Sequence, residues 1–174
     1  MEKIKSVLIV ADAGPLIHLD ELTALDVLRD YSAVLVPDAV WNEVSRHRPQ
    51  ALEQTDVRLI HHPPSLSSPK IKAIASLYTL HHGEQEALSL CLTHSINTLT
   101  TDDTAARLAA KTLNIKAHGT LGLLIRAVRK NFRTPSEVLF LLSEIPQRTT
   151  LHVRPSLLKD VINTVRTEWN ITDE

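Results

Sequence analysis

The fold is decided by the stretch from Val7 to Pro15, which has the sequence VLIVADAGP. Its first five residues are apolar and rich in β-branched side chains, which is typical of a strand buried in a parallel sheet. Asp12 ends this apolar run, and Pro15 is well tolerated in the first turn of a helix. The stretch therefore predicts a buried strand, an acidic residue at its carboxyl end, and a helix that follows at once.

Outward from this stretch, short apolar runs alternate with helical patterns. Further strands are predicted at residues 33–36, 57–60, 97–100 and 115–117. Helices are predicted after Pro15 and Pro37, from Gly83 to about His94, from about Asp103 to Thr112, from Gly119-Thr120 through Val128, and after Pro135 and Pro155. This alternation indicates an α/β fold with a parallel sheet covered on both faces. The proline-rich segment 48–70 is interpreted as a surface excursion of the same domain.

The composition suits one compact domain, because 43% of the 174 residues are hydrophobic. The single cysteine, Cys91, excludes an internal disulfide framework and favours a reducing compartment. Only five apolar residues stand between Met1–Ser6 and Asp12, too few for a signal-peptide core or a membrane span. We therefore expect a cytoplasmic protein.

Charge is distributed unevenly along the chain, although the net charge is only −1. Residues 1–110 hold nine Lys/Arg and fourteen Asp/Glu, whereas residues 111–174 hold ten and six. An acidic site and a basic surface on one chain would suit phosphate chemistry. An ordinary solvated charged face is the alternative.

Four acidic residues stand at the predicted ends of strands and helices. Asp12 and Asp102 each follow a strand, and the carboxyl ends of parallel strands meet at one edge of the sheet. Glu84 begins a helix and shares its apolar face, and Glu43 lies one turn after Ala39 and Val40. Glu86 lies about 200° around the helix from Glu84 and should face elsewhere.

Converging carboxylates raise one another's pKa, and a hard cation such as Mg²⁺ or Mn²⁺ removes that penalty. Each acid also has a structural interpretation. Asp12 could be a turn residue, Asp102 or Asp103 a helix N-cap, and Glu84 a partner of the helix dipole. Glu43 could be a charge at the rim. The four positions together favour a common cause.

The stretches that carry these acids resemble, in order, the motifs of PIN-domain proteins. They are Ile9–Ile17, Val40–Val44, Gly83–Leu88 and Thr100–Arg107, followed by the Gly-Thr-Leu-Gly stretch 119–122 that is found in one prokaryotic subgroup. The similarity spans Val7 to about Val128. Each motif is weak alone, but the ordered set is specific.

The resemblance implies a three-layer α/β/α fold and hydrolysis of RNA phosphodiester bonds with one or two Mg²⁺ or Mn²⁺ ions. Asp12, Glu43, Glu84 and Asp102 would be catalytic. The metal ligands would be Asp12, Glu84 and one of the two adjacent aspartates, Asp102 or Asp103. Asp102 is preferred because it directly follows the strand, and Asp103 would then act through water. Thr100 or Thr101 would position water or phosphate, unless they are ordinary strand-end hydroxyls.

The resemblance also implies partners and a division of the chain. Many such proteins are toxins of type II toxin–antitoxin pairs, similar to the VapC type, and are often dimeric, so RNA, an antitoxin and a second copy are the expected partners. Residues 1–130 would form the nuclease domain and 131–174 a helical extension packed on it. A cluster of Arg126, Arg129, Lys130 and Arg133 is predicted to hold RNA phosphates, unless it is a solvated face or a dimer contact.

Two other functions stay open at this point. One is a PIN-like protein that binds nucleic acid or a partner protein without cutting, and the other is a phosphohydrolase of small molecules. Zinc is disfavoured despite nine histidines, because adjacent histidines cannot point at one ion and only one cysteine is present. The sequence has no Gly-x-Ser-x-Gly elbow and no P-loop.

Overall fold

The computed structural model describes residues 7–172. The stretch Met1–Ser6, on which the expected absence of a signal peptide rests, lies outside the described residues. No described helix combines the length and the apolar character that crossing a membrane requires.

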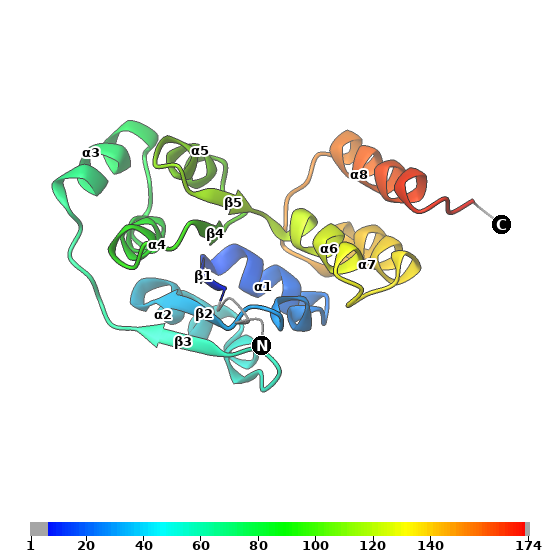
Figure 1. The fold of residues 1–174 in the computed structure, drawn as a ribbon, viewed down its shortest axis with the longest axis horizontal. Helices are drawn as coiled ribbons and strands as arrows, with labels where there is room; N and C mark the ends of the chain where they lie inside the picture. Colours follow the sequence, from blue (N-terminus) through cyan, green and yellow to red (C-terminus); the bar gives the residue numbers. More distant parts are fainter. Residues whose placement is uncertain (1–6, 173–174) are drawn as a thin grey trace, which may run out of the picture.

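Five parallel strands form a single central sheet (Figure 1). They are β1 (Leu8–Ala11), β2 (Ala33–Pro37), β3 (Leu59–His62), β4 (Thr98–Thr100) and β5 (Lys116–His118), in the order β3-β2-β1-β4-β5. The predicted parallel sheet is confirmed. Strand β3 lies two residues later than predicted, where Leu59 pairs with Val34 of β2.

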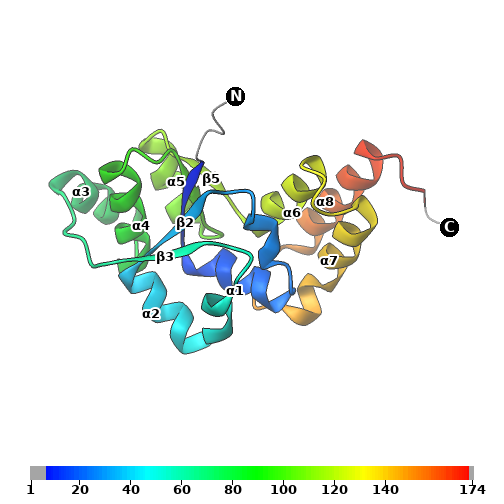
Figure 2. The ribbon, with the colours of Figure 1, turned by 60° about the horizontal axis from the view of Figure 1, so that its bottom comes forward.

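Side chains of the strands alternate between two hydrophobic cores, one on each face of the sheet. In β1, Ile9 and Ala11 belong to one core, and Val10 belongs to the other. Helices α1 (Ala13–Glu21), α2 (Asp38–His47), α6 (Thr120–Arg129) and α7 (Pro135–Arg148) contribute to the first core. Helices α3 (Pro69–Tyr78), α4 (His82–Thr93) and α5 (Thr104–Thr112) contribute to the second. Figure 2 shows α3–α5 and α6–α8 on opposite sides of the strands, which confirms the three-layer α/β/α fold.

The C-terminal helices complete the first core. Val138 and Leu142 of α7 are fully buried in the same cluster as Ile9 of β1. Helix α8 (Pro155–Glu168) packs on α7 and adds the buried Val165. The boundary proposed after residue 130 stays a prediction, and the core is continuous across it.

One helix was not predicted from the sequence. Helix α3 closes the proline-rich segment, with Ser68 as N-cap, whose hydroxyl accepts a hydrogen bond from the Ile71 amide at 3.3 Å. Pro69 occupies its first position, where a proline is favoured. Only Ile71 and Ala75 of this helix are buried, so its apolar periodicity is too weak to recognise. Two short 3-10 turns, Leu25–Leu28 and Pro49–Glu53, complete the structure.

The strand order reverses between β1 and β4. From β1 the chain continues to β2 and β3 on one side, while β4 and β5 lie on the other. In open α/β sheets, ligands bind outside the carboxyl ends of the strands at such a switch point. The residues that follow these two strands, Asp12 and Thr101, therefore stand where a site is expected.

Candidate active site

Asp12 stands at the carboxyl end of β1, where it is 8% exposed. Its amide donates to the carbonyl of Thr100 at 2.9 Å, which fixes the backbone against β4. Its carboxylate accepts hydrogen bonds from the Ala13 amide at 2.9 Å and from the Thr101 hydroxyl at 2.8 Å. Asp12 is thus the N-cap of α1 as well as a candidate catalytic residue, and both of its oxygens are oriented.

Burial raises the pKa of the Asp12 carboxyl from 3.8 to about 6. The hydrogen bonds from Thr101 and Ala13 oppose this rise, and the negative charges of Glu84 and Glu43 add to it. The three carboxylates therefore lie within each other's electrostatic field. The negative charge that collects here is the kind that a bound cation compensates.

Asp12, Glu43 and Glu84 line one pocket between the first turns of α2 and α4. The helices approach closely because residue 83 is glycine, where a Cβ atom would lie 3.3 Å from Val40 and 4.0 Å from a Glu43 carboxylate oxygen. Glu84 is 8% exposed, and its carboxylate accepts a hydrogen bond from the His81 amide at 2.8 Å. The structure thus brings three of the four predicted catalytic acids together.

Glu86 does not itself line this pocket, but its carboxylate contacts two residues that do, Ala39 and His82. It is 3% exposed, and its carboxylate accepts a hydrogen bond from the Ala39 amide at 2.8 Å. This contact satisfies a free amide in the first turn of α2, a place where an anion is stabilised. Glu86 therefore joins α4 to the start of α2 beside the pocket.

Asp102, the fourth predicted acid, lines a different pocket. Its carboxylate accepts hydrogen bonds from the Thr120 amide at 2.7 Å, the Thr120 hydroxyl at 2.6 Å and the His18 ring at 2.8 Å. A Cβ atom on Gly119 would lie 2.7 Å from an Asp102 oxygen, closer than Cβ atoms approach other heavy atoms. Gly119 therefore leaves room for the Asp102 carboxylate, and Thr120 donates two hydrogen bonds to it.

The remaining predicted positions have identifiable roles in the fold. Asp103 is the N-cap of α5, and its carboxylate accepts a hydrogen bond from the Ala106 amide at 2.8 Å. Thr101 holds Asp12 and is a positioning residue. The Thr100 hydroxyl is buried and makes no hydrogen bond within residues 7–172. The metal and water-positioning roles of these residues stay predictions.

A family model, DUF3368, described as a PIN domain, matches residues 8–167 of the chain. The chain belongs to the PIN-domain family. The match includes α7 and α8 and so extends beyond the stretch in which the sequence motifs lie. Neither a curated protein nor a solved structure matches the chain. PIN domains are in general metal-dependent nucleases that bind nucleic acid.

The oxygen donors of this PIN domain fit a hard divalent cation in their chemistry. Asp12, Glu43 and Glu84 supply carboxylates, which Mg²⁺ and Mn²⁺ prefer, and the charges of Glu84 and Glu43 add to the rise in the pKa of Asp12 that burial causes. Within residues 7–172, however, no three His, Cys, Asp or Glu side chains are gathered closely enough to hold an ion. The three acids line the same pocket, but in this structure they are too far apart to bind one ion together.

Several residues of the site were missed by sequence reasoning. Arg46, His81 and His82 line the acidic pocket, and His18 contacts Asp102. The histidines were considered only as zinc ligands, although His18 lies one helical turn after Gly14 and so faces the same edge of the sheet. That spacing was the signal available in the sequence.

The basic cluster predicted to hold RNA phosphates is largely engaged within the fold. Arg126 makes a two-pronged ion pair with Asp30 and lies over the ring of Tyr31. The other two arginines also pair with acids. These pairs are Arg129 with Glu168 and Arg133 with Asp26. All three arginines thus form ion pairs with acids of the same chain, and their predicted RNA-binding role stays a prediction.

We expect Arg126→Ala to lower the free energy of unfolding by about 1–3 kcal/mol, because it leaves the half-buried Asp30 without its partner. Lys130→Ala, on the exposed end of the same helix, should change it by less than about 0.5 kcal/mol. Urea unfolding of both variants measures the difference. An Arg126→Ala protein as stable as wild type would mean that this ion pair does not support the fold.

Proposed function

We propose that this PIN domain is an endoribonuclease that depends on Mg²⁺ or Mn²⁺. The observation that carries the proposal is the buried Asp12, which has a raised pKa and lies beside Glu43 and Glu84 at the switch point of the sheet. A bound divalent cation would neutralise the carboxylates and lower the pKa of a water molecule, which supplies the nucleophile for phosphodiester hydrolysis.

The residues of the chain have separate tasks in this proposal. Asp12, Glu43 and Glu84 would hold the cation, and the Thr101 hydroxyl keeps Asp12 in one orientation. Asp102 is held in one orientation by its hydrogen bonds with Thr120 and His18. Attack of water on phosphorus breaks the bond to the 3′ oxygen and leaves a 3′-hydroxyl and a 5′-phosphate.

The resemblance of the motifs supports the choice of RNA, the role of toxin in a type II toxin–antitoxin pair, the antitoxin partner and the homodimer. The cytoplasmic location rests instead on the single cysteine and on the short apolar run before Asp12. One observation favours the alternative of a PIN-like protein that binds without cutting. Asp102 is held by three hydrogen bonds and borders a different pocket from the other acids. A direct assay must therefore decide between the two.

The test is incubation of the purified full chain with single-stranded RNA and Mn²⁺, with and without EDTA. We expect cleavage that EDTA abolishes and fragments that carry 5′-phosphates. A parallel Glu84→Gln preparation controls for a contaminating nuclease, because it removes one carboxylate of the pocket and nearly no volume. RNA that stays intact with Mn²⁺ would select the non-cutting alternative.

A further inference from the structure

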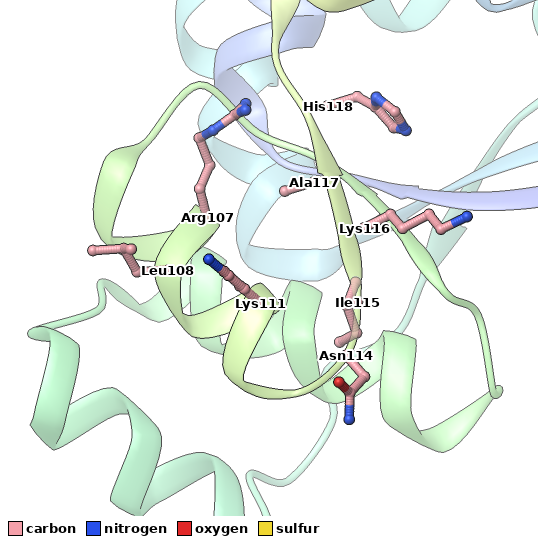
Figure 3. Close-up of a pocket in the computed structure, with 8 residues that line it drawn as sticks. All are labelled: Arg107, Leu108, Lys111, Asn114, Ile115, Lys116, Ala117 and His118. Atoms are coloured by element: carbon pink, nitrogen blue, oxygen red, sulfur yellow. The ribbon is translucent and has the colours of Figure 1, made fainter.

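A groove lined by cations runs along β5, the edge strand of the sheet (Figure 3). Arg107 and Lys111 lie one turn apart on α5, and Lys116 and His118 lie on β5. Figure 3 shows the two pairs on the two sides of the strand. A polyanion that lies over the strand can therefore contact both.

The groove continues into the pocket that reaches Asp102. This second hollow shares Arg107 and His118 with the first and extends to His152 and Arg154, in the segment between α7 and α8. Among the described residues that line the two hollows, Asp102 is the only acid. We call the two hollows together the β5 groove.

The part of the β5 groove that reaches Asp102 lies at the carboxyl ends of the strands, where the acidic pocket also lies. Thr100 of β4 pairs with Ala11 of β1 and with His118 of β5, and the Thr101 amide donates to the His118 carbonyl at 2.9 Å. Strands β1 and β5 are two strand spacings apart, so Asp12 and His118 lie about 10 Å from each other. A chain in the groove is thereby led toward the candidate catalytic acids.

The cations of the groove are available to a ligand, unlike the arginines of α6. Lys111 and Lys116 are exposed, and neither forms an ion pair within residues 7–172. The pKa of His118 is lowered by burial and then by the positive charges of Arg126, Arg107 and Lys116. The potential along β5 is therefore positive.

We propose that single-stranded RNA binds in the β5 groove, with its phosphates on Lys116, Lys111, Arg107 and Arg154 and with its course toward Asp102. The proposal rests on the proposed ribonuclease function for the identity of the polyanion. Spaced cations along a groove fit a backbone that carries one charge per nucleotide.

The test measures binding of a labelled single-stranded RNA oligonucleotide to the full chain by fluorescence anisotropy, in EDTA, between 50 and 200 mM salt. The variant is Lys111→Gln/Lys116→Gln. The matched control is Lys72→Gln/Lys159→Gln, which removes the same charge from exposed positions on α3 and α8. We expect weaker binding by the groove variant and a salt dependence of log K that is shallower by about 1.4, since each phosphate contact contributes about 0.7 for single strands. The control should keep the wild-type slope.

Three outcomes would overturn the proposal. One is a groove variant whose salt dependence of log K equals that of wild type. Another is a control variant that loses as much affinity for RNA as the groove variant. The third is binding of poly-glutamate in preference to RNA, lost in the groove variant, which would assign the groove to an acidic protein. Because EDTA prevents cleavage, the binding result is independent of activity. If the wild-type chain does not cut RNA but the groove variant has a shallower salt dependence, the RNA-binding groove is supported and the proposed nuclease function is contradicted.

Discussion

Asp12→Asn is expected to abolish RNA cleavage while the chain stays folded. The substitution removes one carboxylate from the pocket that Glu43 and Glu84 share with it, so the activity should fall by at least about 100-fold. Asparagine has nearly the same volume and can still accept the hydrogen bond from the Ala13 amide, so the start of α1 is preserved. Single-turnover cleavage with Mn²⁺ measures the loss.

The same variant should be more stable than wild type in the absence of metal, and the gain should depend on pH. The pKa of Asp12 is raised from 3.8 to about 6, so the folded state holds the proton more tightly than the unfolded state. Wild type therefore loses stability as the pH rises from about 4 to about 6, by as much as about 3 kcal/mol at pH 7. Asparagine does not titrate, so the advantage of the variant should be largest at pH 7–8 and vanish near pH 4.

Urea unfolding at pH 4 and pH 8 with EDTA, and thermal melting with added Mn²⁺, check these expectations. Metal should stabilise wild type more than Asp12→Asn, since the variant has lost a ligand. An active Asp12→Asn enzyme would contradict the proposed role of this residue. A variant that is less stable than wild type at both pH values would instead make Asp12 only a structural cap.

The second large effect is expected for Gly119→Ala. The new Cβ atom would lie 2.7 Å from an Asp102 oxygen and 3.0 Å from the Arg107 guanidinium, so the Asp102 carboxylate must move. Such crowding costs about 1–3 kcal/mol of stability. If Asp102 acts in catalysis, a displacement on the order of 1 Å should lower the cleavage rate by about 100-fold.

Gly122→Ala is the matched control in the same motif. A Cβ atom there meets no atom within 4 Å, and the position lies within α6, so alanine should raise stability by about 0.5–1 kcal/mol. Melting temperatures and cleavage rates of the two variants, compared side by side, separate crowding at Asp102 from any general effect of the methyl group. Equal behaviour of the two variants would show that residue 119 does not constrain Asp102.

The sequence predicted the sheet and the acidic pocket because both depend on local patterns. The apolar run before Asp12 specifies a buried strand, and the helical spacing around Glu43 and Glu84 places both on inward faces. Parallel pairing then brings strand ends to one edge. Both predictions use only the pattern of residues close in sequence and the assumption that the strands are parallel.

The arrangement around Asp102 and Arg126 depends on partners that are far away in the sequence. Asp102 meets His18, 84 residues earlier, and Arg126 meets Asp30, 96 residues earlier. Charge and spacing cannot reveal such pairs, because an arginine that binds RNA and one that holds the fold have the same local pattern. For this reason the ion pairs of the α6 arginines were not predicted. The cations along β5 were not predicted as a group, because they are split between a helix and a strand.

Helices α6 and α7 are synthesised late, although the core around the first strand depends on them. Their side chains Leu124, Val138 and Leu142 fill the core against Ile9 of the first strand. During synthesis the amino-terminal part emerges first, so the core around Ile9 stays incomplete until the helices in the last third of the chain have been made. Thr120, which holds Asp102, arrives with them. A ribosome that is still making this protein therefore carries all four acidic residues before the hydrogen bonds that fix Asp102 can form.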